Sequence, residues 1–174
     1  MFISGDHRAD NEGSTTAALV LNSTTRGLSK ATLRTVLIEA GLRPSRQRLD
    51  LGAMIFGWGD HHFTAEMLLK QASCAKAKLS LATIYNTLRQ FTQAGLLREI
   101  AIFGSTTWYD TKTGPHCHLF IEETGELIDV PDGFASSQAS LPIPEGFDLA
   151  GVDIIARLRI KPTSLEPLLS NAHY

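Results

Sequence analysis

The chain has 174 residues, of which 43% are hydrophobic and 20% charged, and its net charge is −2, a composition typical of one or two globular domains. This excludes a collagenous, coiled-coil or wholly disordered chain, and no apolar run approaches the roughly 18 residues of a membrane span. Because the N-terminus lacks a secretory signal and Cys74 and Cys117 are the only cysteines, we expect a protein of the reducing cytoplasm without a membrane partner.

The small net charge conceals two oppositely charged parts of the chain. Residues 26–114 carry twelve basic and six acidic side chains, net +6, whereas residues 115–174 carry three basic and nine acidic ones, net −6. This division favours two modules with different partners, of which the basic one could face a polyanion. From charge alone, chance clustering on the surface is an equally good explanation.

Residues 1–27 are polar with little periodicity, and we expect a flexible tail, with residues 17–21 as the exception. Four short amphipathic helices are predicted after the tail. Their N-caps are Ser29, Ser45, Thr64 and Ser80. The last of these helices spans residues 80–94, and its apolar side chains recur at three- and four-residue steps: Leu81, Ile84, Leu88 and Phe91.

After Gly95 the pattern changes to strands, over Leu97–Phe103 and Thr106–Tyr109 around a turn at residues 104–105. Helices followed by a hairpin predict a winged helix-turn-helix over residues 28–110, and residues 111–115 are a candidate hinge. Residues 116–174 are predicted to form two strands joined at residues 123–125, an irregular stretch over 131–145, a strand over 152–160 and a terminal helical turn at 165–169. So small a module is marginal alone, which favours pairing with a second subunit.

The polar face of the 80–94 helix has no carboxylate. Its amide, hydroxyl, guanidinium and phenol groups suit base edges and phosphates: Thr83, Tyr85, Asn86, Arg89, Gln90 and Gln93. For Tyr85, a partly buried aromatic that anchors the helix is an equally good explanation. The candidates for phosphate contacts are basic: Arg43, Arg46, Arg48, Lys76 and Lys78. Any one of these taken singly is more often solvated surface.

Four positions offer metal ligands. His116 and His118 are two residues apart on a predicted strand, so their side chains leave the same face, and Cys117 leaves the other. Asp110 ends the predicted wing, and His62 stands at the start of the third helix, with His61 as its alternative. Three imidazoles and one carboxylate can share a first-row cation, although a lone pair of histidines is more often structural.

Five segments, in this order, resemble the ferric uptake regulator family: GLRPSRQRL, HHFTAEMLL, LSLATIYNTLRQFTQAGLL, WYDT and HCHLFIEETGELIDV. Three stretches, AEMLL, LATIYNTLRQFTQAGLLREI and EGFDLAGVDIIARLRIK, are similar to its alpha-proteobacterial iron response regulator branch. The resemblance implies an α+β fold, with an N-terminal winged helix-turn-helix DNA-binding domain followed by a small α/β dimerisation domain. It also implies a homodimer, or a higher oligomer, that binds AT-rich operators of iron and haem metabolism genes.

The resemblance further implies one regulatory divalent metal per subunit, Fe, Mn or Zn, at His62, Asp110, His116 and His118. The branch implies haem, for which His116 and His118 are the best axial ligands and a haem-delivering protein is a candidate partner. Neither cysteine precedes a proline, which weakens the expectation of haem, and no CxxC pair exists for a structural zinc.

The alternative within the family is a manganese-, zinc- or peroxide-responsive regulator. A metal-dependent enzyme is disfavoured because no second catalytic motif accompanies the histidines. A simple protein-interaction module would leave the basic segment unexplained.

Overall fold

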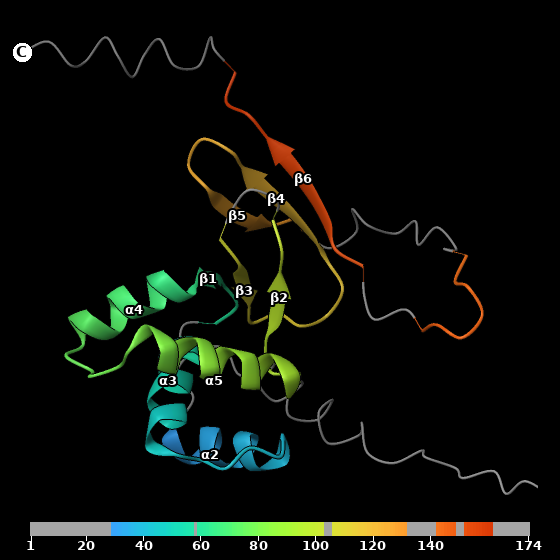
Figure 1. Ribbon diagram of the computed structural model, residues 1–174. Coiled ribbons are helices and arrows are strands. Elements are labelled where there is room, and N and C mark those ends of the chain that lie inside the picture. Colours follow the sequence, from blue (N-terminus) through green and yellow to red (C-terminus); the bar gives the residue numbers. More distant parts are fainter. Residues whose placement is uncertain (1–28, 58, 103–105, 132–141, 149–151, 162–174) are drawn as a thin grey trace, which may run out of the picture. The chain divides into compact units, whose positions relative to one another are not determined.

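The computed structural model describes residues 29–57, 59–102, 106–131, 142–148 and 152–161 (Figure 1). The predicted tail, the turn at 104–105 and the helical turn at 165–169 lie outside these residues. The chain divides into two compact units, with the boundary between Thr113 and Gly114. In the described part, no helix is long and apolar enough to cross a membrane.

Four helices build the first unit, and all four predicted N-caps are confirmed. The helices are α2 (Lys30–Glu39), α3 (Arg46–Phe56), α4 (Ala65–Cys74) and α5 (Leu81–Gln93). In each, the side-chain oxygen of the capping serine or threonine accepts a hydrogen bond from the backbone N–H three residues further on. Such a bond satisfies one of the N–H groups that a helix start leaves without an intrahelical partner.

The core of the first unit lies between the apolar faces of these helices. Its largest fully buried side chains from α2, α3 and α5 are Leu33, Leu37, Leu51, Ile55, Ile84, Leu88 and Phe91. Leu81 is 36% exposed, because it is the first residue of α5 and precedes the turn that packs inward. Helices α4 and α5 lie side by side as the predicted helix-turn-helix (Figure 1).

A three-stranded antiparallel sheet completes the first unit, in the order β1-β3-β2. Strands β2 (Arg98–Ile100) and β3 (Trp108–Asp110) form the predicted hairpin but are shorter than predicted, and β3 ends one residue later. Strand β1 (His62–Thr64) was not predicted, because three residues directly before a helix are too few to show an alternating pattern. Its pairing with β3 sets His62 opposite Asp110.

The second unit contains a mixed three-stranded sheet in the order β5-β4-β6. Strands β4 (Cys117–Ile121) and β5 (Glu126–Asp129) form the predicted hairpin, whose turn uses Gly125 at a φ of 68°. Strand β6 (Ile154–Leu158) lies within the predicted segment and runs parallel to β4. The fold class is therefore α+β, with a winged helix followed by a small α/β module.

Candidate functional site

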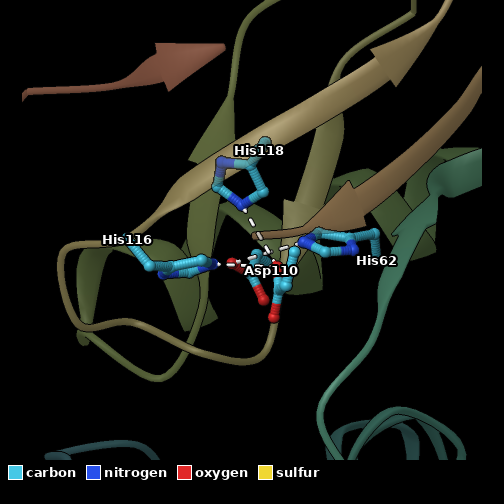
Figure 2. A group of neighbouring side chains, drawn as sticks. His62, Asp110, His116 and His118 are labelled. Atoms are coloured by element: carbon cyan, nitrogen blue, oxygen red, sulfur yellow. Dashed lines mark hydrogen bonds and ion pairs between the residues drawn. The ribbon is translucent and has the colours of Figure 1, made fainter. Parts of the chain in front are cut away.

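The first unit holds one imidazole and one carboxylate together. The Nε2 atom of His62 lies 3.7 Å from Oδ2 of Asp110, and the two side chains are 8% and 1% exposed (Figure 2). The backbone N–H of Lys112 donates to Oδ1 of Asp110 over 2.7 Å. This bond fixes the carboxylate through one oxygen and leaves the other directed at the imidazole, an arrangement typical of a prepared ligand pair.

The second unit holds two imidazoles and one carboxylate close together. From His116 and His118, the Nε2 atoms lie 3.0 and 3.6 Å from Oδ1 of Asp129. The two rings have centroids 4.3 Å apart (Figure 2). The Nδ1 atom of His116 lies 2.8 Å from the Gly114 carbonyl oxygen, which can only accept a hydrogen bond. The same ring has its Nε2 atom within hydrogen-bond distance of Asp129, so contacts on both nitrogens fix its orientation.

The four predicted metal ligands thus occupy two sets, one in each unit, and the sequence prediction missed Asp129. The side chains with metal-ligating atoms are His62 and Asp110 in the first unit, and His116, His118 and Asp129 in the second. The register of the β4–β5 hairpin pairs His118 with Asp129, so the predicted turn at 123–125 contained the signal that would have found this carboxylate.

The neighbouring residues His61 and Cys117 are placed differently. The Nδ1 atom of His61 lies 2.9 Å from the Gly59 carbonyl oxygen and its ring packs on Phe63, so His62 is the histidine that faces Asp110. Cys117 is a buried free thiol. Imidazole nitrogens and carboxylate oxygens suit zinc, iron and manganese alike, and this donor set does not select one of them.

Helix α5 presents the predicted polar side chains at its surface. Tyr85, Asn86, Arg89 and Gln93 are exposed, and Thr83 and Gln90 are half-buried. Tyr85 is 38% exposed and lies outside the hydrophobic core, which disfavours a purely anchoring role. Its hydroxyl donates to Oε1 of Glu66 on α4 over 2.8 Å. This hydrogen bond lowers the pKa of Glu66 and raises the pKa of Tyr85.

The basic candidates near the start of α3 differ in their contacts. Arg48 donates from Nε to Oε1 of Gln90 over 3.0 Å and from Nη1 to the Arg43 carbonyl oxygen over 2.6 Å. Its guanidinium therefore serves the packing of α3 on α5. Arg46 is highly exposed and forms only a loose pair with Asp50, at 3.7 Å, which leaves it available to an external phosphate.

Comparison with known proteins assigns this chain to a family. The sequence model of the ferric uptake regulator family matches residues 39–156. The peroxide-responsive repressor PerR of Staphylococcus aureus is 31% identical over 93 residues, which are 53% of this chain and 62% of that protein. The chain thus spans less than two thirds of the length of such curated relatives.

Two solved structures share the fold. The ferric uptake regulator of Pseudomonas aeruginosa, solved with manganese, has a TM-score of 0.61 and 27% identity, and the match covers 74% of this chain and 98% of that one. The ferric uptake regulator of Vibrio cholerae has a TM-score of 0.61 and 23% identity over 73% of this chain and 98% of that one. At the lower identity, the likeness concerns the fold alone.

Proposed function

The chain belongs to the ferric uptake regulator family, and on this premise we propose that it is a metal-responsive transcription regulator that binds double-stranded DNA as a homodimer. We propose residues 28–110 as the DNA-binding domain, residues 111–115 as a hinge and residues 116–174 as the dimerisation and sensing domain. In this proposal the metal site controls DNA binding and catalyses no reaction, so the protein is not an enzyme. Its place of action is the cytoplasm.

The observation that carries this proposal is the outward face of α5. Tyr85, Asn86 and Arg89 are exposed on a helix whose opposite face is buried, and the described α5 has no carboxylate. A second helix of a helix-turn-helix enters the major groove, where amides and guanidinium groups read base edges. Thr83 and Gln90 complete the proposed reading face, and Arg43 and Arg46 supply phosphate contacts at the start of α3.

For the metal, we propose that one divalent cation takes ligands from both units. Its ligands are His62, Asp110, His116 and His118, to which we add Asp129. The residues present fit such an ion, because the Gly114 carbonyl oxygen orients the His116 ring and the Lys112 backbone N–H orients the Asp110 carboxylate, as second hydrogen bonds do for metal ligands. When bound, the ion would supply a crosslink between the units, which biases the population that is competent to bind DNA.

We propose iron status as the signal, read as the metal or as haem, because the sequence resembles the iron response regulator branch. In the haem form, His116 and His118 are the axial candidates and a haem-delivering protein would act upstream. The alternative is a manganese, zinc or peroxide signal. Two relatives support this alternative, since the Pseudomonas regulator was solved with manganese and PerR is named for its response to peroxide.

The test begins with selection of preferred sequences from a random duplex library by the full chain, with and without Mn²⁺. Fluorescence anisotropy of the selected duplex is then measured with Mn²⁺, Zn²⁺, Fe²⁺ under anaerobic conditions, and haem. Sequence-specific, salt-dependent binding that responds to one of these ligands is expected. Equal affinity for selected and scrambled duplexes under every condition would refute the proposal.

A further inference from the structure

We infer that Glu66 of α4 is a positioning residue for Tyr85 and makes this tyrosine a reader of thymine rather than a phosphate contact. The inference rests on the proposed function, because it concerns what α5 presents to DNA. It is carried by one contact, the hydrogen bond of 2.8 Å from the Tyr85 hydroxyl to Oε1 of Glu66. The contact joins the two helices of the helix-turn-helix.

Glu66 is itself well placed to hold this bond. It lies in the first turn of α4, next to Ala65 and two residues after the capping Thr64, where the helix dipole favours a negative charge. A carboxylate acceptor makes a stronger hydrogen bond than a neutral oxygen does. The end of the Tyr85 side chain is thereby tied to a second helix.

The bond restricts a side chain that would otherwise move. Tyr85 is 38% exposed, and an exposed tyrosine samples several rotamers of its first side-chain torsion. Ordering such a side chain on binding costs free energy, which a preformed contact reduces. With its hydroxyl fixed on Glu66, the ring of Tyr85 is held in one orientation on the surface of α5 before DNA arrives.

The same bond removes one kind of DNA contact. A tyrosine hydroxyl has a single proton to donate, and Tyr85 donates it to Glu66. While this bond exists, the hydroxyl cannot donate to a phosphate, which leaves the ring as the apolar part of Tyr85 that can contact DNA and the hydroxyl oxygen as an acceptor only. In the major groove, the apolar group that an aromatic ring can meet is the thymine methyl.

The charge of Glu66 supports this division of roles. A carboxylate beside a DNA-reading helix repels phosphates and lowers the affinity for any duplex, whatever its sequence. Glu66 therefore lowers the affinity for DNA of any sequence while it holds the Tyr85 ring in one orientation. Removal of its charge alone and removal of its hydrogen bond should consequently have different effects, and two substitutions separate them.

The experiment compares the wild type with Glu66→Ala, which removes acceptor and charge, and Glu66→Gln, which keeps a carbonyl acceptor. Glu39→Gln, an exposed carboxylate at the end of α2, is the matched control. The probes are the duplex selected by the wild type, copies in which single thymines are replaced by deoxyuridine, and a scrambled duplex. Removal of one contacted methyl should weaken wild-type binding about fourfold.

We expect Glu66→Ala to lose this thymine-against-uracil discrimination at the contacted position while it binds the scrambled duplex as tightly as the wild type or more tightly. Glu66→Gln should keep most of the discrimination and gain generic affinity, and Glu39→Gln should keep the full discrimination. A folded Glu66→Ala variant, checked by thermal unfolding, with wild-type discrimination would overturn the inference.

The outcome for the wild type separates the two levels of the argument. If the wild type selects no sequence, the proposed function fails and this inference fails with it. If the wild type selects a sequence but no thymine methyl contributes to its binding, only the inference is overturned. Parallel losses on selected and scrambled duplexes in Glu66→Gln would assign Glu66 a merely structural role and would overturn it as well.

Discussion

His118 of β4 lies directly opposite Asp129 of β5, with its Nε2 atom 3.6 Å from Oδ1 of the carboxylate. The same oxygen lies 3.0 Å from Nε2 of His116, so one carboxylate serves two imidazoles. At 3.0 Å the carboxylate orients the His116 ring as a hydrogen-bond partner, and it lies beside His118 as a further candidate ligand. The second unit therefore holds three donors whose placement depends on the register of a single hairpin.

The substitution Asp129→Ala should weaken binding of Mn²⁺ or Zn²⁺ by at least about tenfold, because it removes a donor and frees the His116 ring. Competition with a chromogenic chelator measures the affinity. Glu126→Ala is the control, since Glu126 lies on the same strand but is exposed. Wild-type affinity in Asp129→Ala would remove this residue from the proposed site.

Two adjacent histidines should behave differently. His62→Ala should lower the metal affinity as Asp129→Ala does, because its Nε2 lies 3.7 Å from the buried Asp110 carboxylate. His61→Ala should leave the affinity unchanged, since its ring bonds to the Gly59 carbonyl oxygen. The same chelator competition applies, and a loss confined to His61→Ala would reverse the assignment.

The helices and the predicted ligands were accessible from the sequence because both depend on local signals. A serine or threonine before an apolar repeat marks a helix start, and Ser29, Ser45, Thr64 and Ser80 all cap as predicted. Strand β1 and Asp129 were missed, since a three-residue strand has no periodicity and a cross-strand partner is fixed by register. The Glu66–Tyr85 bond joins residues 19 positions apart, and only the packing of α4 on α5 reveals it.

The turn between α4 and α5 contains a strained residue. Lys76 has a φ of 55°, a conformation that costs a residue with a Cβ atom about 1–2 kcal/mol. Lys76→Gly relieves this strain but gains entropy in the unfolded chain, so we expect a net stabilisation of up to about 1 kcal/mol.

Urea denaturation measures this change. Lys78→Gly is the matched control, because Lys78 is a lysine in the same turn without a positive φ, and it should be neutral or destabilising. If both variants lose stability equally, the backbone of Lys76 is not strained in solution.

Tyr109 of β3 predicts a pH dependence at the alkaline end. Burial, with a smaller contribution from the charge of Glu99, raises the pKa of Tyr109 to about 12 from the ordinary 10.0. A raised pKa in the folded state means that the native protein binds this proton more tightly than the unfolded chain does. Stability from this source is complete below about pH 10 and is lost as the pH rises toward 12.

Tyr109→Phe should abolish that part of the alkaline loss of stability, since the substituted ring has no proton to lose. The free energy of unfolding, measured by urea titration at a series of alkaline pH values, tests this. Phe63, which stacks on Tyr109, remains as the neighbour that preserves the packing. An unchanged alkaline slope in the variant would show that other groups cause it.

Arg46 and Arg48 are near neighbours in α3, and we expect their substitution to affect DNA affinity and folding stability, respectively. Arg48→Ala removes the hydrogen bonds to Gln90 and to the Arg43 carbonyl oxygen, and we expect a loss of about 1–3 kcal/mol in the free energy of unfolding. Arg46 is exposed, with a loose pair to Asp50, so Arg46→Ala should cost less than about 1 kcal/mol.

For DNA binding we expect the opposite, with Arg46→Ala the more damaging of the two substitutions. The slope of log affinity against log salt should fall by about 0.9 in Arg46→Ala, the value for one lost phosphate contact, and remain unchanged in Arg48→Ala. A lower salt slope in Arg48→Ala alone would mean that its guanidinium leaves Gln90 to contact DNA.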